Sequence, residues 1–454
     1  MPKKKTALTI EERLQQALVP AEEQPYEVPE NWVWVRLGEI NKYVSKSVNP
    51  INEPDKIFEL YSVPSMADDY PEIIAGSDIG SSKQSVCKED VLLCKINPRI
   101  NRVWKVSQFT DNELIASSEW IIIRNNHINA NYLMYCFQSK YFREFMLSNV
   151  SGVGGSLMRA QPKYVQTYPI PLPPLSEQQR IVERIEELFA KLDEAKEKLQ
   201  EVADSFAVRK AAILHKAFTG ELTKQWRREN GVSDESWEER KLGEVGSWLG
   251  GGTPSTSREE YWENGNILWI TSKDMKSTVI EDTLMKVNEI GVKNSSANYI
   301  EKPALLVVMR SGILRRTFPV AMVKKPFTVN QDLKAIIPDE DDLEFLYWML
   351  LSNEQRILNT CMKNGTTVES INSNALKNLT FKCPSLPEQH EIVRLIDDLL
   401  ARERAAQQAA EQALASIDLM KKSILARAFR GELGTNKASE ANALELLRQV
   451  LAEN

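Results

Sequence analysis

Basic and amide side chains gather in one short stretch of the first half of the chain, directly after an apolar run at 91–96 that is typical of a buried strand. Arginine and lysine can neutralise phosphate or donate two hydrogen bonds to guanine, and asparagine can pair with adenine. The stretch is therefore a candidate nucleic-acid contact, and the alternative is a solvated loop of an ordinary β-rich domain. Its residues are Lys95, Asn97, Arg99, Arg102 and Lys105, with Trp104 among them.

The second half of the chain carries a similar stretch at a matching place. An apolar run at 304–309 is followed at once by arginine, serine and glycine. The same chemistry and the same alternative apply, so this is a second candidate contact. Its residues are Arg310, Ser311, Arg315 and Arg316.

Groups that would make the chain an enzyme are sparse. There is no G-x-x-x-x-G-K-[ST] phosphate loop, and the glycine-rich stretch 152–155 leads into a proline-rich strand where a dinucleotide site needs a helix. Asp332 and Lys334 have the spacing of a nuclease metal motif but lack a companion acid. A structural or solvated role is favoured for the acid–base candidates, which are His127, His215 and His390. We expect no catalytic and no metal-binding residue.

Cysteine usage and charge narrow the class of protein. The cysteines are odd in number and never in C-x-x-C spacing, which argues against disulfides and zinc; they are Cys87, Cys94, Cys136, Cys361 and Cys383. No apolar run is long enough to span a membrane, and no apolar segment follows the N-terminal lysines, so we expect a cytoplasmic protein. The net charge is −6 and neither β-rich half is basic on average, so a nucleic-acid contact would need a local basic face or help from partners.

A stretch at 175–222 occurs twice in the chain. A shift of 211 residues carries Leu175-Ser-Glu-Gln-Gln-Arg-Ile-Val onto Leu386-Pro-Glu-Gln-His-Glu-Ile-Val, and Gly220-Glu-Leu onto Gly431-Glu-Leu, with no gap between. One inserted residue would rotate everything after it by about 100°, so an ungapped repeat predicts a continuous helix in each copy. The first, from 176 to 217, would be roughly 60 Å long.

Apolar residues within both copies follow steps of four and three, a period that predicts helix pairing. The apolar side chains in the middle of the first copy are large, whereas those in the middle of the second copy are small, at Ala406, Ala410 and Ala413. Antiparallel packing sets middle against middle, so we expect an antiparallel pair. The expected seam is Ile181, Ile185, Leu188, Leu192, Leu199, Phe206 and Ile213 with Ile392, Ile396, Leu399, Ile417, Met420 and Ile424.

Capping residues mark both ends of each expected helix. Ser176 and Ser385 are the expected N-caps, with Gln179 and Glu388 completing a capping box. Gly220 and Gly431, in the sequence Phe-x-Gly-Glu-Leu, are expected just past the C-termini, where a left-handed residue ends a helix.

The remaining sequence forms two similarly organised blocks of short strands. Trp32 and Leu37 of the first block recur as Trp237 and Leu242 of the second, both shifted by 205 residues. Helices are expected at 10–18, 130–147 and 343–358. Strands are expected at 33–37, 57–63, 91–96, 120–123, 168–172, 267–270, 304–309, 320–323 and 335–337. The expected class is α+β, with two β-rich domains separated by two long antiparallel helices in an internal, pseudo-two-fold duplication.

The domain boundaries follow from this organisation. We expect an N-terminal arm at 1–28, a first recognition block at 29–174, a first long helix at 175–222, a linker at 223–235, a second recognition block at 236–384, a second long helix at 385–433 and a tail at 434–454. Nearly unchanged helices joined to divergent blocks describe one frame that holds two different readers.

With these repeats, the chain resembles the specificity subunit of a type I restriction-modification system. The helix motifs and the exits at Gly220 and Gly431 carry the resemblance jointly. So do Gly251-Gly-Thr-Pro-Ser, Ile270-Thr-Ser-Lys-Asp-Met and Asp90-Val-Leu-Leu-Cys-Lys-Ile-Asn-Pro-Arg, which are similar to target-recognition domains. The resemblance adds weaker DNA-contact candidates, which are Thr253, Ser255, Ser272 and Lys273.

The resemblance implies a non-catalytic reader of double-stranded DNA. Each recognition domain would read half of a bipartite site, and the helix pair would set the spacing. The pair would also dock two modification subunits, which use S-adenosylmethionine to methylate adenine, and restriction subunits that use ATP and Mg would join them. No cofactor is expected in this chain. The alternative, favoured by the acidic charge and the long seam, is a coiled-coil scaffold whose β-rich domains bind proteins.

Overall fold

The computed structural model describes residues 8–152, 158–363 and 368–452, and the chain divides into two compact units. Unit 1 comprises Met1–Leu199 and Gln412–Asn454, and unit 2 comprises Gln200–Glu411. Residues 153–155 of the glycine-rich stretch and the N-terminal lysines lie outside the described residues. No helix in the described ranges is long and apolar enough to cross a membrane.

Unit 1 contains a five-stranded sheet in the order β2-β5-β8-β3-β4 and a three-stranded sheet in the order β7-β6-β9. Two-stranded pairs join β1 to β12 and β10 to β11. The strands are β1 (Val33–Arg36), β2 (Ser47–Val48), β3 (Ile57–Tyr61), β4 (Glu72–Ala75), β5 (Lys83–Ser85), β6 (Val91–Cys94), β7 (Val103–Lys105), β8 (Glu113–Ala116), β9 (Trp120–Ile123), β10 (Val150–Ser151), β11 (Arg159–Ala160) and β12 (Pro169–Leu172).

Unit 2 contains a four-stranded sheet in the order β14-β20-β17-β18, a three-stranded sheet in the order β16-β15-β19 and the pair β13-β21. The strands are β13 (Glu238–Lys241), β14 (Gly246–Gly250), β15 (Ile267–Ile270), β16 (Met285–Val287), β17 (Ala304–Val308), β18 (Val320–Val323), β19 (Phe327–Val329), β20 (Leu333–Pro338) and β21 (Thr380–Cys383).

The two units share one connection pattern, which confirms the expected duplication. The order β7-β6-β9 of unit 1 matches β18-β17-β20 of unit 2, and β4-β3-β8 matches β16-β15-β19. In both, one pair is parallel: β3 with β8, and β15 with β19. The α+β class with two β-rich domains and antiparallel long helices is therefore confirmed.

Apolar runs form the central strands because both of their faces are buried. In β6, Val91 and Leu93 pack toward the helices of unit 1, whereas Leu92 and Cys94 pack toward the five-stranded sheet. In β17 of unit 2, Leu305 packs toward the helices, whereas Leu306 packs toward the sheet that contains β15 and β19. A strand buried on both faces reads as a continuous apolar run, which is why these strands were predictable.

The helical segment that contacts the three strands around β6 or β17 occupies an equivalent place in each unit, against β7 in unit 1 and against β18 in unit 2. Each expected single helix, at 130–147 and at 343–358, is wrong, because the chain forms two helices that break at Ser139 and at Asn353. The helices are α1 (Ile10–Ala17), α2 (Leu37–Ile40), α3 (Ala130–Gln138), α4 (Lys140–Ser148), α5 (Pro162–Val165), α8 (Lys224–Asn230), α9 (Glu289–Lys293), α10 (Leu343–Ser352), α11 (Glu354–Cys361), α12 (Ser373–Lys377) and α14 (Ala443–Ala452).

The first long helix is not one continuous segment. It consists of α6 (Leu175–Asp204) and α7 (Phe206–Phe218), although hydrogen bonds from the Ser205 amide to the Glu201 carbonyl and from the Arg209 amide to the Ser205 carbonyl, 3.0 Å each, carry the chain across the break. The second, α13 (Leu386–Ala428), is continuous. Ser176 is not an N-cap, because α6 already begins at Leu175 and the Ser176 hydroxyl bonds Glu440 instead.

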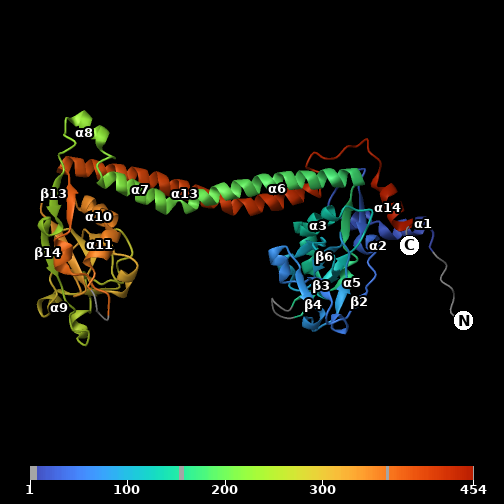
Figure 1. The fold of residues 1–454 in the computed structure, drawn as a ribbon, viewed down its shortest axis with the longest axis horizontal. Helices are drawn as coiled ribbons and strands as arrows, with labels where there is room; N and C mark the ends of the chain where they lie inside the picture. The colour runs from blue at the N-terminus through green and yellow to red at the C-terminus, as the bar shows by residue number, and fades with distance from the viewer. Residues whose placement is uncertain (1–7, 153–157, 364–367, 453–454) are drawn as a thin grey trace. The chain divides into compact units, whose positions relative to one another are not determined.

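The long helices pack antiparallel within each unit (Figure 1). In unit 1 the start of α6 packs against the end of α13, and the Lys421 ammonium lies 2.6 Å from the Asp193 carboxylate. In unit 2 the end of α7 packs against the start of α13, and Arg209 pairs with Glu403 at 2.5 Å.

The expected seam residues differ in burial. Met420 does not belong to the seam, because 47% of it is exposed, and Leu425 is buried on the next turn. Buried are Ile181, Ile185, Ile392, Ile396 and Ile417; half-buried are Leu188, Leu192, Leu199, Phe206, Ile213, Leu399 and Ile424.

A buried carboxylate lies in the first turn of each long helix. In unit 1, Glu177 accepts hydrogen bonds from the Trp32 indole at 2.8 Å and from the Asn436 amide at 2.9 Å. In unit 2, Glu388 accepts from the Thr223 hydroxyl and the Arg227 guanidinium, both at 2.7 Å. Each carboxylate therefore holds the segment that follows the C-terminus of the opposite helix.

The glycines at those C-termini have the expected conformation. Gly220 has φ +78° and Gly431 has φ +74°, the left-handed region that a side chain would strain. The chain after Gly431 continues to α14, which packs on α1 in the core of unit 1, where Arg13 donates to the Leu451 carbonyl at 3.0 Å.

Candidate nucleic-acid interface

The first candidate stretch forms the tip of the β6–β7 hairpin. A short 3₁₀ turn at Pro98–Ile100 closes it, and the residues on either side, Asn97 and Asn101, have φ of 47° and 27°. Asparagine tolerates positive φ better than most residues, so this sequence can turn sharply here. The Asn101 side-chain amide also donates to the Gln138 carbonyl at the end of α3, at 3.0 Å.

Main-chain hydrogen bonds brace this tip from a second segment. The Asn97 amide donates to the Met158 carbonyl and the Ala160 amide donates to the Lys95 carbonyl, both at 2.8 Å. The Lys95 amide donates to the Glu119 carbonyl at 3.0 Å, in the turn after β8. Arg143 of α4 adds a hydrogen bond to the Arg99 carbonyl. The backbone of the tip is thus held on three sides.

The predicted side chains of this tip differ in exposure and in whether an acidic side chain pairs with them. Arg99 is exposed, and Lys95, Asn97 and Arg102 are half-buried. Lys105 lies on β7 and pairs with Glu89 at 3.5 Å, so its charge is partly neutralised. Across the described ranges, no carboxylate lies within ion-pair distance of Arg99 or Arg102.

The second candidate stretch forms the equivalent tip, between β17 and β18. It also contains a 3₁₀ turn, at Gly312–Arg315. The Ser311 amide donates to the Glu369 carbonyl at 3.0 Å, and the Ile371 amide donates to the Met309 carbonyl at 2.8 Å. These bonds repeat the bracing of the first tip, with the segment 369–371 in the place of 158–160.

The arginines of this tip also differ in whether an acidic side chain pairs with them. Arg310 and Arg316 are exposed, and no carboxylate of the described chain is within ion-pair distance of either. Arg315 forms an ion pair with Glu369, which lowers the pKa of that carboxyl. Arg315 is therefore a weaker phosphate-contact candidate than its neighbours.

The remaining candidates of unit 2 lie at the same edge. Strands β14 and β17 both end beside the start of β20, where Gly250 pairs with Lys334 and Val308 with Leu333. The turn 330–332 joins them: the Gln331 side chain accepts from Thr253 at 2.8 Å, and the Asp332 carbonyl accepts from the Met309 amide at 2.8 Å.

A second turn at this edge carries Ser272 and Lys273. The Asn330 amide donates to the Ile270 carbonyl at 3.0 Å, which places the turn after β15 beside the turn after β19. Ser255 bonds Ser257 at 2.8 Å and is exposed, as are Thr253 and Lys273, whereas Ser272 is half-buried. The structure therefore gathers the predicted residues of unit 2 along one edge of its sheets.

A glycine is required where this edge is tightest. An added Cβ at Gly251 would lie 1.9 Å from the Val329 carbonyl oxygen, so no other residue fits without moving β19. This close approach gives a physical reason for the Gly251-Gly-Thr-Pro motif.

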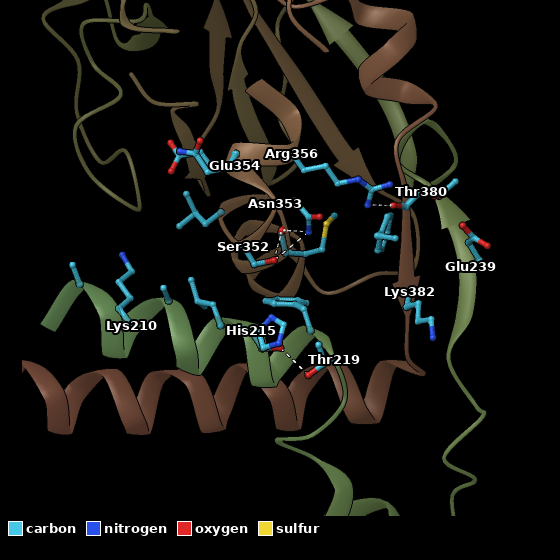
Figure 2. A pocket seen from close by; sticks show the side chains of 18 residues that line it. Lys210, His215, Thr219, Glu239, Ser352, Asn353, Glu354, Arg356, Thr380 and Lys382 are labelled. Carbon is cyan, nitrogen blue, oxygen red and sulfur yellow. Dashed lines mark hydrogen bonds between the residues drawn. The ribbon is translucent and has the colours of Figure 1, made fainter. Parts of the chain in front are cut away.

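A hollow of about 920 Å³ in unit 2 holds one of the candidate histidines (Figure 2). His215 lies on α7, and among the described residues no side chain is within hydrogen-bonding distance of its imidazole. Nearby polar groups serve the fold: Glu354 accepts from the Phe318 amide at 2.7 Å, and Arg356 donates to the Thr380 carbonyl at 3.0 Å. Within the described ranges, His215 therefore has no acidic side chain as an ion-pair partner.

His390 and Asp332 have partners that serve the local structure. His390 lies 3.4 Å from the Asp342 carboxylate on the surface of α13. Asp332 accepts from the Asn330 side chain at 3.3 Å within its turn. Within the described residues, no group of three histidine, cysteine or acidic side chains could hold a metal ion.

Sequence reasoning missed several residues of the two tips. Ile100 and Ile313 are exposed beside the arginines, and Asn101 and Arg143 brace the first tip. The pair Asn97 and Asn101, four residues apart around Pro98, was an available signal for a tight turn. Arg143 and Glu369 had none, because their contacts are distant in sequence.

Comparisons with known proteins agree with this architecture. A family model described as the type I restriction modification DNA specificity domain matches residues 29–204 and 234–413. The chain is 41% identical over 159 residues to the Escherichia coli type I restriction enzyme EcoR124I/EcoR124II specificity subunit, covering 35% of this chain and 39% of that protein.

Two further relatives extend the coverage. The chain is 25% identical over 350 residues to the type I restriction enzyme StySPI specificity subunit from Salmonella potsdam, covering 72% of each. The crystal structure of the HsdS subunit from Thermoanaerobacter tengcongensis superposes with a TM-score of 0.68 at 22% identity, over 90% of this chain and 99% of that one, and shows the shared fold. Because the family model matches both recognition blocks and most of both long helices, the chain belongs to the type I restriction-modification DNA specificity family.

Proposed function

We propose that this chain is the DNA-reading subunit of a type I restriction-modification complex in the cytoplasm, with each β-rich block reading one half of a bipartite site. One observation carries the proposal: both units present an equivalently braced hairpin tip with arginines that no carboxylate in the described ranges neutralises. Exposed guanidinium groups on a fixed backbone suit phosphate and base-edge contacts.

The overall acidity of the chain is compatible with this proposal because the positive charge is local. Arg99 and Arg102 in unit 1, and Arg310 and Arg316 in unit 2, lie on tips rather than being spread over the surface. Modification subunits bound nearby would add to the field that attracts DNA.

The partners follow from the duplication. Two equivalent halves offer two equivalent docking places, so the complex would hold two modification subunits, joined by restriction subunits. The modification subunits would supply S-adenosylmethionine-dependent adenine methylation, and the restriction subunits would supply ATP- and Mg-dependent cleavage. This chain would contribute recognition and spacing and no catalytic group. Native mass spectrometry of the co-expressed complex is expected to give two modification subunits per chain.

Binding assays test the proposal directly. The chain assembled with its modification subunits is expected to bind one bipartite duplex far more tightly than a duplex with the same bases shuffled. Its affinity should fall steeply with salt, by a log–log slope of about −0.9 for each phosphate contacted. Equal binding to both duplexes would refute it, and tight, salt-insensitive binding of a protein ligand by the β-rich blocks would favour the scaffold alternative.

A further inference from the structure

Each hairpin tip exposes one isoleucine among its arginines. Ile100 ends the 3₁₀ turn of unit 1 with 52% of its surface exposed, and Ile313 lies in the turn of unit 2 with 42% exposed. Arg99 and Arg102 flank the first, and Arg310 and Arg316 flank the second. The two tips differ in length and sequence, so the recurrence concerns the turn and its chemistry and not one aligned position.

A single exposed apolar residue needs no explanation in itself. These two are unusual because their backbones are fixed. The Asn97 amide, three residues before Ile100, and the Ser311 amide, two residues before Ile313, donate to carbonyls of a neighbouring segment at 2.8 and 3.0 Å. Leu314, next to Ile313, is 1% exposed and anchors the turn in the core. The fold therefore holds an isoleucine outward, at a fixed place, in both units.

The surroundings indicate what such a side chain meets. Guanidinium groups on both sides favour a polyanion, so phosphate contacts would bring the tip against a DNA groove. A branched apolar side chain pressed into the major groove finds one apolar group on the base edges, the C5-methyl group of thymine. Burying this contact removes methyl and methylene surface from water on both partners.

We propose that Ile100 and Ile313 are specificity-determining residues, each contacting a thymine methyl group in the half-site that its own unit reads. This inference rests on the proposed function and deepens it. The arginines position the tip on the phosphates, and the isoleucine reads a base. The substitution Ile100→Ala is then expected to weaken discrimination at one half-site only, and Ile313→Ala at the other.

The experiment uses the complete complex with its modification subunits and the bipartite duplex identified from the modified motif of the host. Competition binding is measured for wild type, Ile100→Ala and Ile313→Ala, with duplexes in which 2′-deoxyuridine, which lacks the methyl group, replaces thymidine in one half-site. Wild type is expected to lose about three- to tenfold in affinity for the duplex altered in the first half-site. Ile100→Ala should lose a similar factor on the unmodified duplex and then be insensitive to that replacement.

Two exposed isoleucines at the opposite edge provide matched controls. Ile57 is 41% exposed and is the first residue of β3. The tip of unit 1 instead contacts the turn after β8, and that turn lies beside the last residue of β3. Ile290, 55% exposed, lies on α9 after β16, beside the start of β15. Ile57→Ala and Ile290→Ala should bind as wild type does.

The outcomes separate the inference from the function it rests on. If wild type binds shuffled and bipartite duplexes equally, the proposed function fails. If wild type discriminates but Ile100→Ala binds as tightly, or stays sensitive to deoxyuridine, or weakens both half-sites alike, the isoleucine contact is wrong while the function stands. A loss in the control variants equal to that at the tips would also overturn it. Unchanged melting temperatures, expected for exposed positions, exclude misfolding.

Discussion

The buried ion pair at the start of α13 gives a prediction whose size follows from the structure. The Glu388 side chain is fully buried, and Arg227 beside it is 6% exposed. Removing one partner of a buried pair costs about 3–5 kcal/mol, because the other charge is left without compensation. Here Arg227 would keep Asp234 at 3.1 Å and the Gly220 carbonyl at 2.8 Å, so Glu388→Ala should lie at the lower limit, about 3 kcal/mol.

Hydrogen exchange followed by mass spectrometry measures this cost at the place where it arises. A loss of about 3 kcal/mol in local stability raises the opening equilibrium by roughly 100-fold in peptides covering residues 220–230 and 386–400. Peptides covering 175–190, which belong to unit 1, should be unchanged. Glu388→Gln keeps an acceptor for Thr223 and Arg227 and should fall between wild type and Glu388→Ala.

A second ion pair on the same helix is the control. Asp398 and Arg402 pair at 3.3 Å with side chains 54% and 76% exposed, a setting in which an ion pair contributes about 0–1 kcal/mol. Asp398→Ala should therefore change exchange by no more than a few-fold. The reasoning fails if Glu388→Ala accelerates exchange no more than Asp398→Ala does, because burial would then add nothing to the pair.

Three further predictions concern charge, pH and spacing. In a salt titration of the complex, Arg99→Ala should weaken binding of the bipartite duplex at all salt concentrations and reduce the salt slope by about 1. Arg315→Ala should change the affinity and the slope less, because Glu369 partly neutralises the charge of Arg315. Burial raises the pKa of Glu177 above its ordinary value of 4.5, and this effect outweighs the hydrogen bonds from Trp32 and Asn436, which lower the pKa. The contribution of protonated Glu177 to the stability of unit 1 is therefore full below pH 4.5 and is lost as the pH rises through the raised pKa. Glu177→Gln should flatten this pH dependence in unfolding measurements. Residues inserted after Gly220 should change the gap between the half-sites and leave both half-sites unaltered in methylome sequencing, and altered half-sites would count against a spacing role for the helices.

The repeated helices and the central strands were predictable because their signals are local and strong. The expected limits of β9, β15 and β18 match the structure, since each is an apolar run bounded by polar residues. Strands such as β14, with the sequence Gly-Ser-Trp-Leu-Gly, and the two-residue β2 give no such signal. They exist because a neighbouring strand pairs with them, which is a tertiary effect.

The helix breaks were missed for a related reason. The apolar pattern continues across Ser139, yet its backbone is extended, with φ −65° and ψ 155°, and ends α3 before α4 begins. At Ser205 the backbone stays close to helical, with φ −77° and ψ −4°, so α6 and α7 remain nearly one helix. A pattern of apolar residues reports which face is buried and does not report such single-residue departures.

The candidate site was predictable in its residue types and not in its electrostatics. Arg99 and Arg310 follow strong strand signals, so their loops could be located. Which arginine keeps a free charge depends on acids far away in sequence: Glu369, which neutralises Arg315, is 54 residues further along the chain. No pattern within the loop reveals that partner.

The braces of the two tips explain how one frame can hold different readers. The bonds from Asn97 to Met158 and from Ser311 to Glu369 join main-chain atoms, so they do not depend on which side chains those positions carry. The frame itself is demanding: an added Cβ at Gly38 or at Gly243 would meet Gln166 or Lys377 at 3.0 Å, in matching places of the two units. Sequence is therefore constrained where strands and helices meet, whereas exposed tip positions such as Arg99 and Ile313 are not fixed by these contacts. Recognition can change through tip side chains while the backbone that presents them stays in place.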